Sequence, residues 1–309
     1  MRYKIIVNPV SGRGAGERSM PFIDKSFKDE GLTYELVKTE FPGHAIELAQ
    51  HAVIDGFDVV VSVGGDGTSN EIVNGLMRAK EHLGHTSTMS VIGVGRGNDF
   101  AYGVGIPTGV EAGCRTIFTN NRFKIDIGKV ISEDFPQGRY FGNGVGIGFD
   151  AVVGFEAVKM KRLSGFPSYI IAALKTIFLY YTAPYIRIQS DNGETTEIAS
   201  LLVSIMNGRR MGGGFHMAPD AIVNDGKFDV CIAQEVSKLR IFSLIPHFIR
   251  GTQMSQKEIH HLKTRSISVI ALQGNLPAHA DGETISVTGK EITAEILPDQ
   301  LEVIGGKPK

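Results

Sequence analysis

This chain of 309 residues contains no tryptophan and only two cysteines, Cys114 and Cys231. The two cysteines lie far apart and form no CxxC pair, so a reduced, cytosolic protein is the simplest interpretation, with both thiols buried and inert. An excess of charge of one sign is also lacking, because 32 Lys and Arg residues are balanced by 33 Asp and Glu residues. No chain-wide charge recruits nucleic acid, and we expect no nucleic-acid partner.

Long apolar runs are absent as well. A bilayer span needs roughly 20 apolar residues, and the most apolar segment, Phe166–Tyr181, is shorter and is interrupted by Lys175. This segment is expected either to pack on neighbouring strands or to lie at a membrane interface over an acyl-chain slot. A second apolar helix, Leu239–Arg250, has the same two interpretations. The first residues have too short an apolar run for a signal peptide.

Glycine, by contrast, is abundant, and the segment Val59–Met77 shows its use: a β-branched run, the sequence GGDGT, and then a helix-compatible stretch. The glycines let the main chain approach a bulky anion closely, and a helix opening near Thr68 aims its free N–H groups into the same space. Asp66 would be repelled by phosphate unless a cation lies between them or it meets a hydroxyl or amide instead, so Mg-nucleotide explains it better than bare phosphate. A simple strand-to-helix turn explains a lone GGDG equally well.

Strand, loop and helix alternate along the first part of the chain. Three polar, glycine-rich loops follow Val7, Val63 and Val94. Such alternation predicts a doubly wound parallel sheet with ligands at the carboxyl ends of its strands. From about residue 129 short β-type runs with turns replace the alternating units, which predicts a second, antiparallel β-sandwich domain. We therefore expect a nucleotide-binding α/β domain over residues 1–128 and a β-sandwich over residues 129–289.

Four aspartates allow more than one interpretation on their own. The Asp-Gly pairs at Asp225 and Asp281 are strong hairpin-turn signals. Asp99 follows Asn98 and is in place to cap the next helix. Asp126 lies in an otherwise apolar strand, where an unpaired buried carboxylate is costly, so a functional role is harder to dismiss for this residue.

Taken together, the ordered motifs resemble the soluble bacterial diacylglycerol kinase-like lipid kinases, which are related to the catalytic domains of diacylglycerol, sphingosine and ceramide kinases. The motifs are Asn8-Pro9-x-Ser11-Gly12, Gly64-Gly65-Asp66-Gly67-Thr68, Asn98-Asp99-Phe100-Ala101, Asp126-x-Gly128, Asn143-x-x-Gly146-x-Gly148-x-Asp150-Ala151, Gly212-Gly213-Gly214-Phe215, Asp225-Gly226-x-x-Asp229 and Asp281-Gly282-Glu283. GGDGT alone is shared with NAD kinases and resembles phosphofructokinase loops. The later glycine and DGE elements point to the lipid-kinase branch, and the match spans nearly the whole chain.

The resemblance implies an enzyme that uses ATP and Mg²⁺ to phosphorylate a lipid hydroxyl, with diacylglycerol or a related lipid as acceptor. It also implies a cytoplasmic protein, peripheral at the inner face of the membrane, whose residues 290–309 return to the first domain. The implied catalytic residues are Asp281 as the base, Glu283 and Asp66. The implied metal-binding residues are Asp66, Asp99 and Asp126 near the phosphates and Asp225 at a second, structural Mg²⁺. The implied nucleotide contacts are Asn8, Pro9, Ser11, Gly12, Gly64, Gly65, Asp66, Gly67, Thr68, Arg96 and Asn98.

The chain also departs from the family pattern. Arg96 stands where relatives usually carry Thr, Gly93 where they often have Pro, and Ala15 where a basic residue is common. Arginine is able to bind phosphate through a forked pair of hydrogen bonds, or to obstruct the usual nucleotide pose. Two alternative functions therefore stay open: a kinase of a soluble substrate such as NAD, and a non-catalytic nucleotide-binding regulator. A homodimer through the sandwich edges also stays open.

Overall fold

The computed structural model describes residues 1–159, 171, 175 and 183–306. Its internal contacts divide the chain into two units, Met1–Ile127 with Pro298–Lys309, and Gly128–Leu297. The predicted apolar helix Phe166–Tyr181 lies outside the described residues, apart from Ile171 and Lys175. Within the described ranges, no helix is both long enough and apolar enough to cross a membrane.

The first unit is built on a parallel sheet. Its strands are β1 (Arg2–Val7), β2 (Thr33–Lys38), β3 (Val59–Gly64) and β4 (Thr88–Gly93), in the order β2-β1-β3-β4. The end of a late strand, β15 (Glu291–Ile304), joins this sheet in parallel, with Val303 opposite Met89 on β4. Every residue of β3 and β4 is buried, as expected for a parallel sheet that is covered on both faces.

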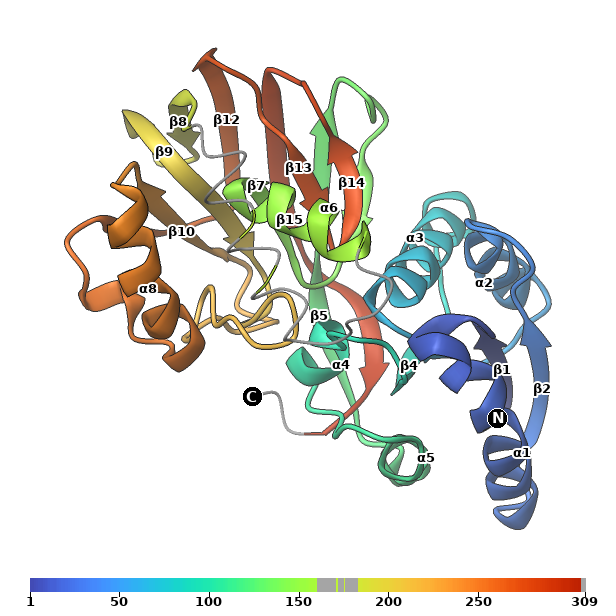
Figure 1. Cartoon of the computed structure of the whole chain (residues 1–309). Helices are drawn as coiled ribbons and strands as arrows, with labels where there is room; N and C mark the ends of the chain where they lie inside the picture. The colour runs from blue at the N-terminus through green and yellow to red at the C-terminus, as the bar shows by residue number, and fades with distance from the viewer. Residues whose placement is uncertain (160–170, 172–174, 176–182, 307–309) are drawn as a thin grey trace. The chain divides into compact units, whose positions relative to one another are not determined.

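Five helices alternate with these strands: α1 (Ser11–Asp29), α2 (His44–Ile54), α3 (Asp66–Leu83), α4 (Asp99–Gly103) and α5 (Val110–Thr119). Helices α2 and α3 pack against each other over one face of the sheet, and α1 and α5 over the other (Figure 1). The predicted doubly wound α/β architecture is confirmed.

Helix α1 contains Pro21 in its interior, although proline is favoured in a first helical turn. In the structure the helix runs through Pro21, and Ser11 is its first residue. Residues 12–14 are not helical, however, since their φ angles are positive. The glycines of the first loop therefore distort the start of the helix rather than keeping it a separate surface turn.

Both cysteines are free and buried, which confirms the prediction made for them. Cys114 lies on α5 and packs into the core beneath α1. Burial raises the pKa of the Cys114 thiol to about 11, so the thiol stays protonated and unreactive at neutral pH.

The second unit is a β-sandwich. Its strands are β5 (Arg122–Ser132), β6 (Arg139–Phe141), β7 (Gly144–Gly148), β8 (Tyr185–Ser190), β9 (Thr195–Met206), β10 (Phe228–Gln234), β11 (Ile259–Thr264), β12 (Ser266–Gln273), β13 (Ala278–Ala280) and β14 (Glu283–Ser286), with the first half of β15. The long strand β9 belongs to two sheets, because its first half pairs with β8 and its second half with β7 and β10. These ladders are antiparallel, as predicted.

An apolar core fills the space between the sandwich sheets, with Phe141 and Phe228 stacked at 5.6 Å between ring centroids. The sequence prediction missed β11, β13 and β15. Strand β13 is only three residues long, and the exposed edge strand β11 is largely polar. Residues 291–295 of β15 pair with β12, so the return to the first unit begins at Pro298 and not at residue 290.

Within the described residues, helices α6 (Phe149–Lys159) and α8 (Lys238–Arg250) accompany the sandwich, and the short turn η1 (Gln253–Ser255) follows α8. The apolar face of α8 packs inward through Ile241, Leu244 and Phe248. Of the two interpretations offered for Leu239–Arg250, packing on the sandwich is therefore confirmed for this face, while Leu239 itself is 82% exposed.

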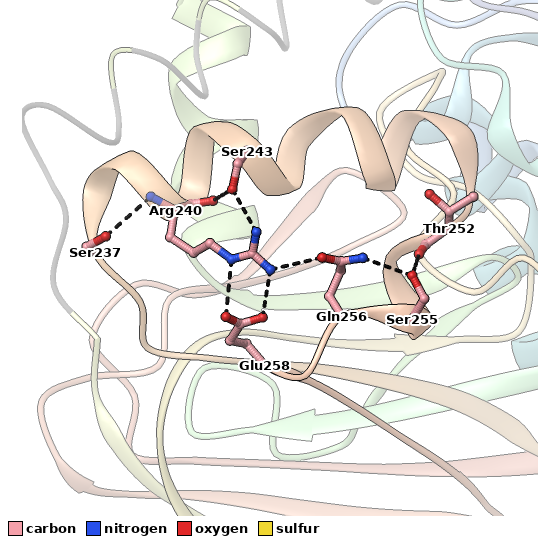
Figure 2. Close-up of polar contacts among 7 residues, drawn as sticks. All are labelled: Ser237, Arg240, Ser243, Thr252, Ser255, Gln256 and Glu258. Carbon is pink, nitrogen blue, oxygen red and sulfur yellow. Dashed lines mark hydrogen bonds and ion pairs between the residues drawn. The ribbon is translucent and has the colours of Figure 1, made fainter.

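The first turn of α8 is fixed by a polar network (Figure 2). Ser237 accepts the backbone N–H of Arg240, and the Arg240 guanidinium donates to both carboxylate oxygens of Glu258, at 3.1 and 3.0 Å. The same guanidinium also donates to Gln256 at 2.9 Å. Forked pairing of this kind ties the helix to the start of β11.

We expect Glu258→Gln to lower the free energy of unfolding at pH 7, and to lower it by less in acid. The hydrogen-bonded Arg240 guanidinium holds the pKa of the Glu258 carboxyl below its ordinary value, which is about 4.3. The pairing therefore stabilises the fold above that ordinary value and is lost as the pH falls through the lowered pKa. Urea unfolding at a series of pH values from 7 to 3 measures the gap, that is, the difference in the free energy of unfolding between wild type and variant. Glu235→Gln, an exposed glutamate of the same unit, is the control, and a gap that is constant with pH would contradict the pairing.

Candidate active site

Three loops meet at the carboxyl ends of β1, β3 and β4. Val94 donates its backbone N–H to Gly64 O at 2.8 Å. The main chain of Gly95 touches that of Gly65, since a Cβ atom on Gly95 would lie 2.3 Å from the Gly65 Cα. A Cβ on Gly12 would lie 2.0 Å from Val94 O. The predicted convergence of the glycine loops is thus a direct main-chain contact within the first unit.

Side chains join the first loop to the second. Asn8 donates through Nδ2 to the Thr68 hydroxyl at 3.0 Å, and its Oδ1 accepts the backbone N–H of Val10. Pro9 follows Asn8, and its carbonyl accepts the backbone N–H of Glu17. Gly12 and the next two residues all have positive φ, and the loop is closed on itself because Gly14 donates its N–H to Val10 O at 3.3 Å.

Asp66 connects the second loop to the third. Its Oδ1 accepts the backbone N–H groups of Asp99 at 2.6 Å and Phe100 at 3.1 Å. Asp66 therefore caps the N-terminus of α4, a role that the sequence offered to Asp99. Asn98, at φ +53°, accepts the Gly95 N–H at 2.9 Å through its Oδ1. Asp66 and Asp99 are brought together, although they are separated by 33 residues.

Asp126 has a main-chain partner within the first unit. It lies on β5, is 1% exposed, and accepts the backbone N–H of Asp299 at 2.8 Å. Among the residues that the structure describes, however, no three His, Cys, Asp or Glu side chains are grouped closely enough to hold a metal ion. Mg²⁺ commonly takes one or two carboxylates and completes its shell with water and substrate phosphate. Asp66 beside the glycine loops fits that simpler arrangement.

Asp225 lies in the second unit, apart from the other predicted metal ligands. Its Oδ1 accepts the backbone N–H of Lys227 at 3.1 Å, and its Oδ2 is 3.4 Å from the Lys263 ammonium. In this structure Asp225 thus has the contacts of a turn residue and of an ion pair. Its role at a structural Mg²⁺ stays a prediction.

In the second unit, Asp281 and Gly282 form a two-residue hairpin loop between β13 and β14. Their φ angles are +48° and +88°, and Ala280 pairs with Glu283 across the loop, so the hairpin interpretation is confirmed. Within the hairpin, Gly282 also donates its N–H to His279 Nδ1 at 3.3 Å. Glu283 is half-exposed, 3.9 Å from Arg139.

Three consecutive main-chain N–H groups donate hydrogen bonds to the buried Asp281 carboxylate. Gly142 donates to Oδ2 at 2.8 Å, while Asn143 and Gly144 donate to Oδ1 at 3.0 and 2.9 Å. Three such donors stabilise the ionised form of the carboxyl group and fix its direction. Hairpin turn and functional carboxylate are therefore not competing interpretations of Asp281.

Two polar residues that matter here were not found from the sequence. Glu71 on α3 accepts the backbone N–H groups of Gly43 and Ala45 and so caps α2. Asn207, at the end of β9, donates to Gly142 O at 2.9 Å. The sequence signal at Asn207 is only an Asn-Gly pair after an apolar strand, which reads as an ordinary turn.

Comparison with known proteins agrees with this two-unit fold. Residues 2–130 match the diacylglycerol kinase catalytic domain, and residues 143–305 match the YegS C-terminal NAD kinase beta sandwich-like domain. The second match alone covers more than half of the chain. The chain belongs to the bacterial diacylglycerol kinase-like family. It is therefore similar to kinases along its length, and the resemblance drawn from its motifs is confirmed.

Individual relatives of this diacylglycerol kinase-like protein are distant but collinear. A diacylglycerol kinase from Bacillus subtilis is 29% identical over 285 residues, which are 91% of this chain and 89% of the relative. One from Mycobacterium tuberculosis is 28% identical over 300 residues, 97% of this chain and 93% of the relative.

Solved structures establish the fold in the same way. A diacylglycerol kinase from Bacillus anthracis superposes with a TM-score of 0.78 at 23% identity, covering 99% of this chain and 97% of that one. An NAD kinase from Archaeoglobus fulgidus in complex with ATP gives a TM-score of 0.51 at 14% identity, covering 99% and 94%.

Proposed function

We propose that this member of the diacylglycerol kinase-like family transfers the γ-phosphoryl group of ATP, with Mg²⁺, to the hydroxyl of a lipid, diacylglycerol or a related one. The observation that carries the proposal is the junction of three glycine loops at one sheet edge, closed by Asp66. A junction of bare main chain beside the N-terminus of α3 suits a polyphosphate. The relatives named diacylglycerol kinase support the lipid acceptor. A lipid acceptor in turn requires the protein to work at a membrane surface.

On the donor side, the chain supplies alignment. The N–H groups of the first loop and of α3 bind phosphate oxygens, and Asp66 holds the third loop in place. Mg²⁺, when bound at Asp66 together with the phosphates, would neutralise the charge that moves during transfer. Phosphoryl transfer needs chiefly such positioning and charge stabilisation.

On the acceptor side, Asp281 receives the proton of the lipid hydroxyl. Its three N–H partners hold it ionised and fixed in direction, and they also make it a weak base. A weak base suffices because the attacking oxygen loses its proton late in a loose phosphoryl-transfer transition state. Glu283, two residues further on at the start of β14, adds negative charge that favours uptake of the proton by the Asp281 carboxylate.

Transfer of labelled γ-phosphate from MgATP and MgGTP to a panel of lipids in mixed micelles tests the proposal, with lipid-free reactions alongside. We expect labelling of one lipid class, with none in the absence of lipid. Transfer to NAD or a sugar phosphate instead of any lipid would replace the proposal with a soluble-substrate kinase. Nucleotide binding without transfer to any acceptor would replace it with a regulator.

We expect Arg96→Thr to raise KM for MgATP about tenfold while leaving kcat unchanged. Arg96 is exposed on the third loop, between Gly95 and Gly97, where its guanidinium can reach donor phosphates, and a hydrogen bond to a charged group contributes about 1.5–3 kcal/mol. Steady-state kinetics with saturating lipid measure the effect. Arg78→Thr, an exposed arginine on α3, is the control. A lower KM in Arg96→Thr would mean that Arg96 obstructs the nucleotide.

A further inference from the structure

Two of the N–H groups that donate to Asp281 belong to peptide groups whose carbonyl oxygens also accept hydrogen bonds. The Asn143 N–H, which donates to Asp281 Oδ1, shares its peptide group with Gly142 O. The Gly144 N–H, which donates to the same oxygen, shares its peptide group with Asn143 O. Both carbonyls have partners of their own, and these partners come from one place in the chain.

That place is the turn after β9. The Asn207 side chain donates through Nδ2 to Gly142 O at 2.9 Å, and the Asn207 backbone N–H donates to Asn143 O at 2.8 Å. Gly208 adds a second backbone N–H to Asn143 O, also at 2.8 Å. Asn207 is fully buried. Its carboxamide is therefore enclosed in the protein and directed at the main chain of the β6–β7 turn.

A peptide group is planar and, when trans, its C=O and N–H point in opposite directions. Among the described residues, which include Gly142, Asn143 and Gly144, there is no cis peptide bond. Holding the carbonyl end of such a group consequently fixes the direction of its N–H end. Asn207 holds the carbonyl ends of the two peptide groups whose N–H ends bind Asp281 Oδ1.

We infer that Asn207 is a positioning residue for the transfer reaction, acting on Asp281 through these two peptide groups. The inference rests on the proposed function, in which Asp281 accepts the proton of the lipid hydroxyl. Asn207 touches neither substrate nor Asp281 in this role. It orients the carboxylate by orienting the donors around it.

Two substitutions test the side-chain half of this arrangement. Asn207→Asp keeps the shape but places an oxygen where Nδ2 faces Gly142 O, and Asn207→Ser withdraws the donor without adding charge. Misplacement of a reacting group by about 1 Å costs on the order of 100-fold in rate. We therefore expect kcat for lipid phosphorylation to fall on the order of 100-fold in both variants, with KM for MgATP and direct ATP binding unchanged.

Thr264→Val is the matched control. Thr264 is also buried in the second unit, and its hydroxyl lies within hydrogen-bond distance of two acceptors, Asp191 Oδ1 at 2.6 Å and Ser266 O at 2.7 Å. The variant loses a buried donor of the same unit away from Asp281, so it should lower stability without lowering kcat. Equal losses of kcat in Thr264→Val and Asn207→Ser would overturn the inference, because general destabilisation would then explain both.

An NMR measurement separates this inference from the proposed function, because it needs no activity. The amide proton shifts of Gly142, Asn143 and Gly144 report their bonds to the carboxylate. Asp281→Asn should move all three. Asn207→Ser should move chiefly the amide proton shift of Asn143, because the carbonyl of that peptide group, Gly142 O, loses its side-chain partner. The Gly144 shift should change less, because Asn143 O keeps its two main-chain partners. The Gly142 shift should also change less, because Asn207 does not contact that peptide group.

Retention of the wild-type Asn143 amide shift in Asn207→Ser and Asn207→Asp would overturn the inference. If the amide shifts changed as expected but no lipid received labelled phosphate, the positioning of Asp281 by Asn207 would stand. The assignment as a lipid kinase would then be rejected instead.

Discussion

Replacing Asp281 with asparagine is expected to lower kcat for lipid phosphorylation by about a thousandfold, within the 10²–10⁴ range of general acid–base catalysis. Asparagine cannot accept the proton, and its NH₂ group would face one of the main-chain N–H donors that now bind a carboxylate oxygen. The backbone itself should tolerate the change, since Asp281 has φ +48° and asparagine adopts left-handed angles more readily than most residues. Labelled phosphate transfer, ATP binding and Tm measure the result.

The appropriate control is Asp191→Asn. Asp191 is another carboxylate of the second unit that accepts a main-chain N–H, from Arg265 at 3.1 Å. It lies in the turn between β8 and β9, so the variant should change stability only. Full transfer activity in Asp281→Asn would remove Asp281 as the proton acceptor. Loss of ATP binding together with transfer would show that the substitution disturbs the fold and not the chemistry alone.

Much of the first unit could be predicted from sequence because its signals are local. The apolar positions Ala45, Ala49 and Val53 recur at helical spacing, and all three are buried on α2. The β-branched run at β3 is fully buried. In a parallel sheet, loops that follow strands meet at one edge whatever the exact strand order. The convergence of the three loops therefore required no knowledge of long-range register.

The contacts that give individual residues their roles are different, because they join distant parts of the chain. Asp66 was expected to serve a metal or to meet a hydroxyl or amide, and the amides it meets belong to α4, a helix that begins 33 residues later. Asp281 meets the Gly142–Gly144 turn across 137 to 139 residues. Every residue except proline has a main-chain N–H group, so no sequence motif indicates which of these groups will bind a carboxylate.

The second unit shows the same limit at the level of elements. Strand β13, which carries the Asp281 turn, is three residues long and contains a histidine. Alternation cannot be recognised over so few positions. Its place is fixed by pairing with β7 on one side and β14 on the other. Asn207 escaped notice for a related reason, since its importance comes from the two carbonyls it meets and not from its neighbours in sequence.

We expect Gly95→Ala to weaken MgATP binding by about 10- to 100-fold, or about 1–3 kcal/mol, the usual cost of overpacking. The added Cβ would lie 2.3 Å from the Gly65 Cα and 2.9 Å from Asn98 Oδ1. Gly65 offers only main chain at that point, which cannot rotate aside as a side chain can. The third loop must therefore separate from the GGDG loop, and the hydrogen bonds from Asp99 and Phe100 to Asp66 are strained. Calorimetric titration with MgATP measures the change.

Gly113→Ala is the control, because it makes the same change in the same unit on α5, where the nearest atoms belong to Ile92 at 3.3 Å. A small shift of Ile92 accommodates the methyl group, so ATP binding should be retained. If Gly95→Ala lowered Tm but bound MgATP as tightly as Gly113→Ala, the junction of the three loops would be a packing contact and the phosphates would bind elsewhere.

The two principal variants should also fail in opposite ways: Gly95→Ala loses the donor nucleotide, whereas Asp281→Asn retains the nucleotide and loses transfer. Only a protein that binds its donor at the glycine loops and activates its acceptor at the Asp281 turn produces both outcomes.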